Sequence, residues 1–217
     1  MAVRAKQRHR GAQAFLPTLH TLPALRAAVQ TCRGCPLYKF ATQAVFGEGS
    51  AKSRMMLVGE VPGDREDLAG KPFVGPAGAL LDHALLAAGI PRDAVYMTNA
   101  VKHFKYTQRG KRRIHDKPTR YEVEACKPWL DEELAVTKPD IVVLLGATAA
   151  QALLGSAFRV TKSRGQILEE HAAIATYVIA TVHPASVLRA PDDEARRAAR
   201  EEFLADIAVA GELYKKL

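Results

Sequence analysis

The sequence contains little cysteine and no long apolar segment. Three cysteines among 217 residues cannot build the disulfide framework of a small secreted domain. Apolar runs such as 141–145 fall well short of the ~20 residues that cross a bilayer, and no apolar signal core follows the basic residues 1–10. These absences exclude a disulfide-stapled protein, argue against a membrane partner, and predict a cytoplasmic location.

Internal repeats and low-complexity linkers are also lacking. Hydrophobic residues make up 48% of the sequence and charged residues 25%, as in ordinary globular proteins. A chain of 217 residues with this composition has enough apolar material for one core. We therefore expect one monomeric domain over residues 19–217, preceded by a flexible basic arm over residues 1–18.

The net charge of +8 is unevenly distributed. Residues 1–10 contain four basic and no acidic side chains, and residues 102–120 contain eight basic side chains and one acidic side chain. Solvated surface is the ordinary explanation of such charge. The second segment, however, also includes Phe104 and Tyr106. Basic segments with interleaved aromatic side chains are typical of phosphate contacts and base stacking, so nucleic acid is a candidate partner.

Short apolar runs alternate with helical patterns along the chain. Four runs have the composition of strands covered on both faces: 55–59, 95–99, 141–145 and 177–181. Four segments have apolar residues at helical spacing: 77–88, 121–136, 147–154 and 192–213. The alternation predicts the α/β class, with a single domain and a central four-stranded parallel sheet flanked by helices on both faces. Ligands of such sheets bind beyond the carboxyl ends of the strands.

Candidate functional residues stand at the predicted strand ends. The G-E-V-P-G-D segment at 59–64 permits a tight turn, but it has neither a dinucleotide fingerprint nor a P-loop spacing. Asn99 presents an amide that can read a base edge, although asparagine is commonly a turn cap. Phe73, in a Gly/Pro-rich loop, is either a core residue or a stacking platform. His183 is held in extended geometry by Pro184 and is either structural or functional.

The cysteines form one C-x-x-C pair and a distant third. Cys32 and Cys35 flank an Arg-Gly turn, and Cys126 lies in a predicted helix. A tetrahedral site would need a fourth ligand. Zinc, an iron–sulfur cluster and a redox pair are all compatible with this spacing. The pair does not lie between a strand and its following helix, which argues against a thioredoxin-like function.

Six motifs occur in a fixed order: G-E-x-P-G-D, K-P-F-V-G-P-A-G, T-N-x-V-K, A-C-x-P-W-L, G-A-T-A-A and V-H-P-x-S. Together they resemble the iron–sulfur uracil-DNA glycosylases of family 4 and their relatives, over roughly residues 25–213. The insert K-R-R-I-H at 111–115 resembles the UdgX branch of the uracil-DNA glycosylase superfamily. Members of that branch attach themselves covalently to uracil-containing DNA through the loop histidine, whereas ordinary family 4 enzymes have a shorter loop without it.

The resemblance implies which groups are catalytic. Glu60 matches the carboxylate of the first motif, and Asp64 stands where a second carboxylate is implicated. His183 matches the histidine that stabilises O2 of the leaving uracil. His115 matches the histidine that captures C1′ of the sugar, and Arg113 is its basic neighbour in the loop.

The resemblance also implies contacts to uracil and DNA. Phe73 matches the aromatic that stacks on uracil, Asn99 matches the amide that reads its edge and rejects cytosine, and Gly59 and Val61 border the same site. UdgX proteins typically have glutamine where this chain has Val61, so an amide available to position the loop is missing here. The DNA-binding residues that the resemblance implies are Lys111, Arg112, Arg113 and Ser186.

A metal centre is implied as well. The ligands map to Cys32, Cys35 and Cys126, and His103 replaces the fourth cysteine of ordinary family 4 members, as in UdgX proteins. This set implies a [4Fe–4S] cluster that has a structural role, stabilising the fold near the DNA. A zinc site with the same ligands remains the alternative. A histidine ligand raises the potential of an iron–sulfur centre relative to ligation by cysteine alone.

By resemblance, the protein acts in DNA repair, excises uracil from DNA with single strands preferred, and traps C1′ of the sugar on His115 in one turnover. Two alternatives remain open. An ordinary turnover glycosylase of the family 4 type would release more than one uracil per protein. A non-catalytic nucleic-acid-binding module with a metal staple would bind DNA independently of uracil.

Overall fold

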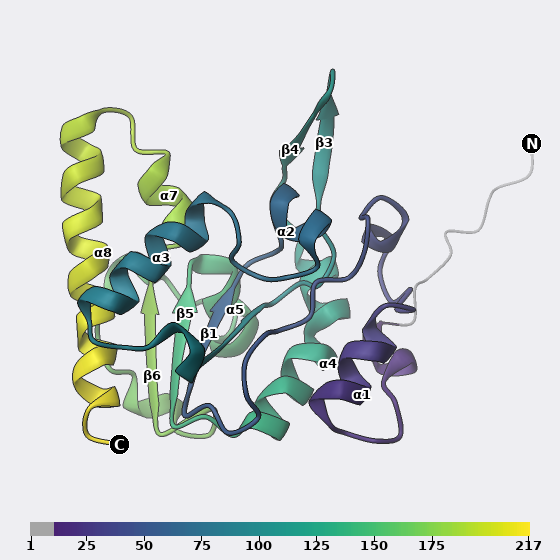
Figure 1. The fold of residues 1–217 in the computed structure, drawn as a ribbon, viewed down its shortest axis with the longest axis horizontal. Coiled ribbons are helices and arrows are strands. Elements are labelled where there is room, and N and C mark those ends of the chain that lie inside the picture. The colour runs from purple at the N-terminus through teal and green to yellow at the C-terminus, as the bar shows by residue number, and fades with distance from the viewer. Residues whose placement is uncertain (1–10) are drawn as a thin grey trace, which may run out of the picture.

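The computed structural model of the protein describes residues 11–217, so the basic segment at 1–10 lies outside the described range. The strands of its central sheet are β1 (Met55–Gly59), β2 (Val95–Asn99), β5 (Ile141–Leu145) and β6 (Tyr177–Thr181). They pair in parallel in the order β2-β1-β5-β6 (Figure 1). All four strands have the predicted bounds, because each is a short apolar run that ends at, or directly before, a polar or glycine residue.

Helices cover both faces of the sheet, as the alternation of strand side chains requires. Met56 and Val58 of β1 belong to one apolar core, whereas Met55 and Leu57 belong to the other. The first core is covered by α1 (Leu22–Val29), α4 (Arg120–Thr137) and α5 (Ala147–Leu154). The second core is covered by α3 (Pro76–Ala87), α7 (Pro184–Leu188) and α8 (Asp193–Tyr214). Figure 1 shows α3 and α8 side by side, and the predicted fold class is confirmed.

The long helices begin and end within one residue of their predicted bounds because capping side chains define their starts. Thr119 and Glu122 form a reciprocal capping box at the start of α4. The Asp192 carboxylate accepts a hydrogen bond from the backbone of Ala195 at the start of α8. Within residues 11–217, no helix is long and apolar enough to cross a membrane.

Short elements connect this framework: α2 (Asp64–Ala69), α6 (Val160–Ser163), and the 3₁₀ helices Ala12–Phe15, Pro36–Lys39, Arg92–Ala94 and Glu169–His171. The first of these 3₁₀ helices falls within the arm expected over residues 1–18. There Ala12 is fully buried, and the Gly11 N–H donates to the Gly34 carbonyl at 3.2 Å. Residues 11–18 therefore include a segment that contacts the domain.

The basic segment at 102–120 is a β-hairpin and not the loop expected from its charge. Strands β3 (Tyr106–Arg109) and β4 (Arg112–His115) pair antiparallel, with Thr107 opposite Ile114. Gly110 in the connecting turn has φ +58°, a conformation that a two-residue hairpin turn requires and that glycine adopts freely. The hairpin projects from the end of the molecule where the strands β1, β5 and β6 end (Figure 1). Four-residue strands give too short an alternation to be recognised from sequence.

Candidate active site

A cavity of about 470 Å³ opens at the carboxyl ends of β1, β2 and β6. Glu60 follows β1, Asn99 ends β2, and His183 lies two residues beyond β6. His115, the last residue of β4, brings the hairpin to the same cavity. The predicted residues that line it are Glu60, Val61, Asp64, Phe73, Asn99, His115 and His183. Residues from five separate segments thus meet at the edge of the sheet where a ligand was expected.

Gly59 allows the Asn99 amide and the Phe73 ring to lie close together. A Cβ at position 59 would be 2.3 Å from Oδ1 of Asn99 and 2.7 Å from Cζ of Phe73, so any larger residue would displace one of them. Asn99 is buried, and within the described part of the chain its amide makes no hydrogen bond. Its donor and acceptor are therefore available to a molecule that enters the cavity.

Phe73 is held in a strained backbone conformation. Its φ of +56° lies in the left-handed region, which costs a non-glycine residue on the order of 1–3 kcal/mol. A Cβ at Gly78 would lie only 1.8 Å from the Phe73 carbonyl oxygen, so α3 can approach this loop only with glycine there. The buried Glu66 carboxylate fixes the same loop by accepting a 2.8 Å hydrogen bond from the Gly75 N–H. The ring centroid of Phe73 lies 6.3 Å from that of His183, with 22° between the planes.

The hydrogen bonding of His183 assigns its proton. Nδ1 accepts a 3.1 Å hydrogen bond from the Ala185 N–H, so a neutral ring carries its hydrogen on Nε2. The pKa of His183 is lowered to about 4, mainly by burial and also by the nearby His115 and Arg189. At neutral pH, His183 therefore presents an Nε2–H donor to the cavity that is not engaged by any of residues 11–217.

Glu60 and His115 are the other reactive groups of the cavity. Oε1 of Glu60 is inaccessible to solvent and has no hydrogen-bond partner among the described residues. His115 is exposed, and its ring centroid lies 6.3 Å from that of Phe104. A buried polar atom without a partner destabilises a folded protein. A ligand or a cation that contacts the Glu60 carboxylate would therefore be bound favourably.

Arg113 attaches the hairpin to α2. Its Nε donates to Asp64 Oδ1 and its guanidinium donates to Asp67 Oδ2, both at 2.6 Å. The guanidinium carbon also lies 5.3 Å from the ring centroids of Phe104 and Tyr106. Asp67 is fully buried, so its charge depends on this arginine for compensation. Asp64 and Arg113, both predicted as catalytic, are thus partners of each other.

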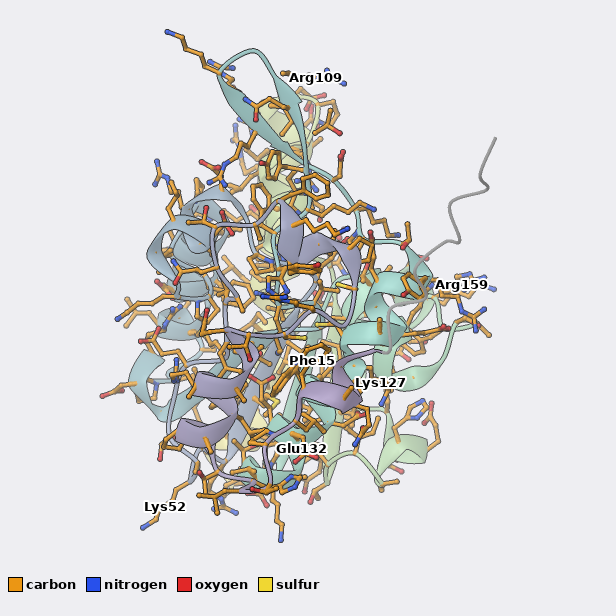
Figure 2. The ribbon with its side chains drawn as sticks, turned by 90° about the vertical axis from the view of Figure 1, so that its right-hand side faces the viewer. Phe15, Lys52, Arg109, Lys127, Glu132 and Arg159 are labelled. Carbon is orange, nitrogen blue, oxygen red and sulfur yellow. The ribbon has the colours of Figure 1, made fainter. Side chains whose placement is uncertain are left out.

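The other residues expected to bind DNA lie outside the cavity. Lys111 and Arg112 are exposed near the turn of the hairpin, close to Arg109 at its upper end in Figure 2. Ser186 is exposed in α7, and its hydroxyl donates to the His183 carbonyl at 2.6 Å.

Sequence reasoning missed the acidic residues that support the site. Glu66 and Asp67 are buried in α2 and hold, respectively, the Phe73 loop and the hairpin. The available signal was the D-R-E-D-L run directly after the first motif, because acids in a first helical turn are typical of a helix start. That pattern predicts an exposed helix end, and only the tertiary structure buries its carboxylates.

A buried ion pair lies beneath Asn99. The Lys102 ammonium contacts the Glu133 carboxylate, and both side chains are fully buried. Lys102 also donates to the Thr98 hydroxyl at 2.6 Å and to the Asn99 carbonyl at 2.7 Å. The Tyr96 hydroxyl donates to Glu133 at 3.0 Å. The backbone of Asn99, whose amide lines the cavity, is therefore fixed by a fully hydrogen-bonded network.

The three cysteines lie close enough to affect one another. All three are buried, and burial is the main cause that raises the pKa of Cys35 to about 11 and that of Cys126 to about 12. Interactions with the neighbouring cysteines contribute to both increases. In the chain alone the Cys35 and Cys126 thiols stay protonated at neutral pH, whereas metal ligation requires thiolates, so binding a cationic centre there would release protons.

The surroundings of the thiols suit thiolate ligands. The Trp129 indole donates to Cys32 Sγ at 3.3 Å, and the Lys102 backbone donates to Cys126 Sγ at 3.2 Å. The next residue, His103, is buried, and burial lowers its pKa to about 4, which leaves the neutral imidazole that binds metals. No three His, Cys, Asp or Glu side chains within residues 11–217 converge as ligands of a single ion. The burial of the three thiols and of His103 is compatible with metal ligands, and both the three-cysteine, one-histidine set and the cluster stay predictions.

Comparisons with known proteins agree with this arrangement. Residues 46–208 match the family described as the uracil DNA glycosylase superfamily. A Type-4 uracil-DNA glycosylase of Pyrobaculum aerophilum is 38% identical over 193 residues, which cover 87% of this chain and 92% of the relative. The protein of that name in Archaeoglobus fulgidus is 36% identical over 203 residues, covering 91% and 96%. The Thermotoga maritima protein is 38% identical over 176 residues, covering 81% and 87%. The chain therefore belongs to the uracil DNA glycosylase superfamily.

Proposed function

We propose that the protein excises uracil from DNA and forms a covalent bond between His115 and C1′ of the resulting sugar. One observation carries the proposal: the hairpin places His115 at the cavity that Asn99, Phe73 and His183 also line. The family membership supports the glycosylase activity. The K-R-R-I-H sequence of the hairpin, with its exposed histidine, supports the covalent step.

The cavity can distinguish uracil from cytosine. A base that has left the DNA stack would lie against the Phe73 ring, with its edge on the Asn99 amide. That amide can accept from N3–H of uracil and donate to O4. Cytosine presents an acceptor and a donor in the opposite order, so at least one hydrogen bond would be lost and a polar group would stay unpaired.

His183 stabilises the leaving group. When the C1′–N1 bond breaks, its electron pair moves to uracil and negative charge collects on O2. The Nε2–H of neutral His183 is already oriented by the hydrogen bond from Ala185, so no reorganisation is needed at that moment. A donor of this kind lowers a barrier by ~3–4 kcal/mol.

His115 then traps the sugar. A ring nitrogen of neutral His115 donates its lone pair to the oxocarbenium carbon C1′, which forms a C–N bond and leaves a proton on the imidazole ring. The Glu60 carboxylate, unpartnered in the same cavity, is available to accept this proton. Imidazole is a poor leaving group from C1′, so the protein would stop after one turnover.

The Arg113 ion pairs explain how the hairpin stays in place with valine at position 61. Val61 is buried and offers no hydrogen bond to the hairpin. Arg113 bridges Asp64 and Asp67 directly, and it fixes the strand whose last residue is His115. We therefore assign Asp64 and Arg113 to positioning the histidine and not to contacts with the base.

The same proposal includes a [4Fe–4S] cluster held by Cys32, Cys35, Cys126 and His103. A bound cluster would connect the segment after α1, the segment after β2 and α4. Its contribution would be structural, since bond cleavage and capture need no electron transfer. An ultraviolet–visible spectrum with iron and sulfide analysis tests this part, because a zinc site would be colourless. Preference for single strands belongs to the proposal as well.

Denaturing gel electrophoresis tests the main proposal. The protein is mixed with single-stranded or duplex oligonucleotides that contain one uracil, and with thymine controls. We expect an adduct that survives SDS with uracil DNA only, with at most one uracil released per protein. His115→Ser should abolish the adduct, and water should then complete turnover. An adduct that persists in His115→Ser would contradict the assignment, and multiple turnovers by the wild type would identify an ordinary glycosylase.

A further inference from the structure

A second cavity, of about 460 Å³, lies between α4 and α5, which we name the α4–α5 groove. Arg120, Val123, Glu124 and Lys127 line it from one face of α4, and Thr148, Gln151 and Ala152 line it from α5. Lys117 and Pro118 border it where the chain leaves the hairpin for α4. We propose that this groove binds a backbone phosphate of the DNA strand beside the nucleotide in the active-site cavity; the inference rests on the proposed uracil-DNA chemistry.

Thr148 points to a polar ligand in the groove. Its side chain is 5% exposed, and its hydroxyl has no hydrogen-bond partner among residues 11–217. A buried hydroxyl without a partner is destabilising, so such groups are normally satisfied by protein, water or ligand. Thr148 also lies in the first turn of α5, where the helix dipole favours an anion.

The charge of the groove favours an anion. Three cationic side chains line it, against one acidic side chain. Arg120 is paired with Glu124 of the groove, and Lys127 is paired with Asp131. Lys117 is exposed, and no acid in the described chain pairs with it. The groove thus offers two hydrogen-bond donors, the Lys117 ammonium and the Thr148 hydroxyl. The oxygens of a phosphodiester can accept hydrogen bonds from both.

The position of the groove favours DNA as the source of that phosphate. Lys117 is two residues beyond His115, so their Cα atoms lie within ~7 Å of each other. A strand whose sugar is held at His115 would therefore carry its next phosphates toward Lys117.

The test compares DNA binding by the wild type with that of three single variants, of which one is a control. Lys117→Gln removes the free ammonium from an exposed position, Thr148→Val removes the hydroxyl with little change of shape, and Lys52→Gln removes a distant charge. Fluorescence anisotropy with a long uracil oligonucleotide gives the dissociation constant at several salt concentrations. We expect Lys117→Gln to weaken binding by ~3–10-fold and to lower the salt slope by ~1, with Thr148→Val weaker in the same direction and Lys52→Gln near the wild type.

Oligonucleotides with uracil at the 5′ end, the middle or the 3′ end locate the contact. We expect the Lys117→Gln effect with the central uracil and with one end position only, because the groove lies on one side of His115. An equal effect in all three, or no effect, would overturn the inference. Inorganic phosphate that binds the wild type by ³¹P NMR without competing with DNA would likewise overturn it.

The inference and the proposed function fail separately. Absence of both adduct and uracil release by the wild type would reject the proposed chemistry, while the anisotropy comparison would still decide the groove. Normal adduct formation at saturating DNA, with unchanged affinity in Lys117→Gln, would reject the groove alone. Thermal unfolding of Thr148→Val controls for a folding defect, and Lys117→Gln carries the test independently because its side chain is exposed.

Discussion

The active-site cavity and the Lys102–Glu133 network are neighbouring polar regions at the same end of the sheet, and they differ in how their polar groups are satisfied. In the network, the ammonium of Lys102 contacts Thr98, Asn99 and Glu133, and all of these groups are buried. In the cavity, the Asn99 amide, the Nε2–H of His183 and Oε1 of Glu60 have no partner among the described residues.

The difference separates two uses of buried polarity. A satisfied network stabilises the fold and fixes its geometry, whereas unsatisfied groups cost stability and are retained where a ligand completes them. Asn99 belongs to both regions, since its carbonyl accepts from Lys102 and its amide faces the cavity. Substitutions in the network should therefore lower stability, and substitutions in the cavity should lower activity.

The largest stability effect should come from Lys102→Met. This change leaves the Glu133 carboxylate buried without its cation and should lower the free energy of unfolding by ~3–5 kcal/mol, measured by urea denaturation at constant metal content. The double variant Lys102→Met/Glu133→Leu is the control, because it removes both charges and should recover much of the loss. A single variant within ~1 kcal/mol of the wild type would contradict a structural role for the pair.

The corresponding loss of activity should come from His183→Asn. Asparagine can still accept the hydrogen bond from Ala185 at the start of α7, so the helix cap is preserved. Uracil release in single-turnover assays should fall by ~100–1,000-fold because the donor to O2 is lost, with little change in the unfolding midpoint. His83→Asn, at an exposed position in α3, is the control. A large drop in stability with unchanged uracil release would place His183 with the network.

The low pKa of His183 predicts a pH dependence of stability. The folded protein keeps this ring neutral down to about pH 4, whereas an unfolded histidine binds a proton near pH 6.5. The stability that His183 contributes is therefore fully present above pH ~6.5 and is lost as the pH falls toward 4. Between these values His183→Asn should reduce the slope of unfolding free energy against pH by up to ~1.4 kcal/mol per unit. Identical slopes in the two proteins would show that His183 titrates normally in the fold.

The sequence predicted the sheet and the residues at the strand ends, because apolar runs and parallel topology are local patterns with a known geometric consequence. It missed the supporting contacts, since these join positions far apart in the chain. Arg113 meets Asp64 across 49 residues, and Lys102 meets Glu133 across 31. Nor does composition indicate that Phe73 adopts a positive φ or that its carbonyl lies against Gly78 of α3, because both are properties of the folded chain.

The smallest effect should separate two glutamates that line the same cavity. Glu66 accepts a hydrogen bond from Gly75, so Glu66→Leu should lower the free energy of unfolding by ~1 kcal/mol. Glu60 has a buried oxygen without a partner, so Glu60→Leu should keep or raise stability by up to ~1 kcal/mol while it abolishes adduct formation. Thermal unfolding and the denaturing gel measure the two outcomes on the same samples. If Glu60→Leu proved the less stable variant, its carboxylate would be satisfied in the free protein, and the contrast between cavity and network would not extend to this residue.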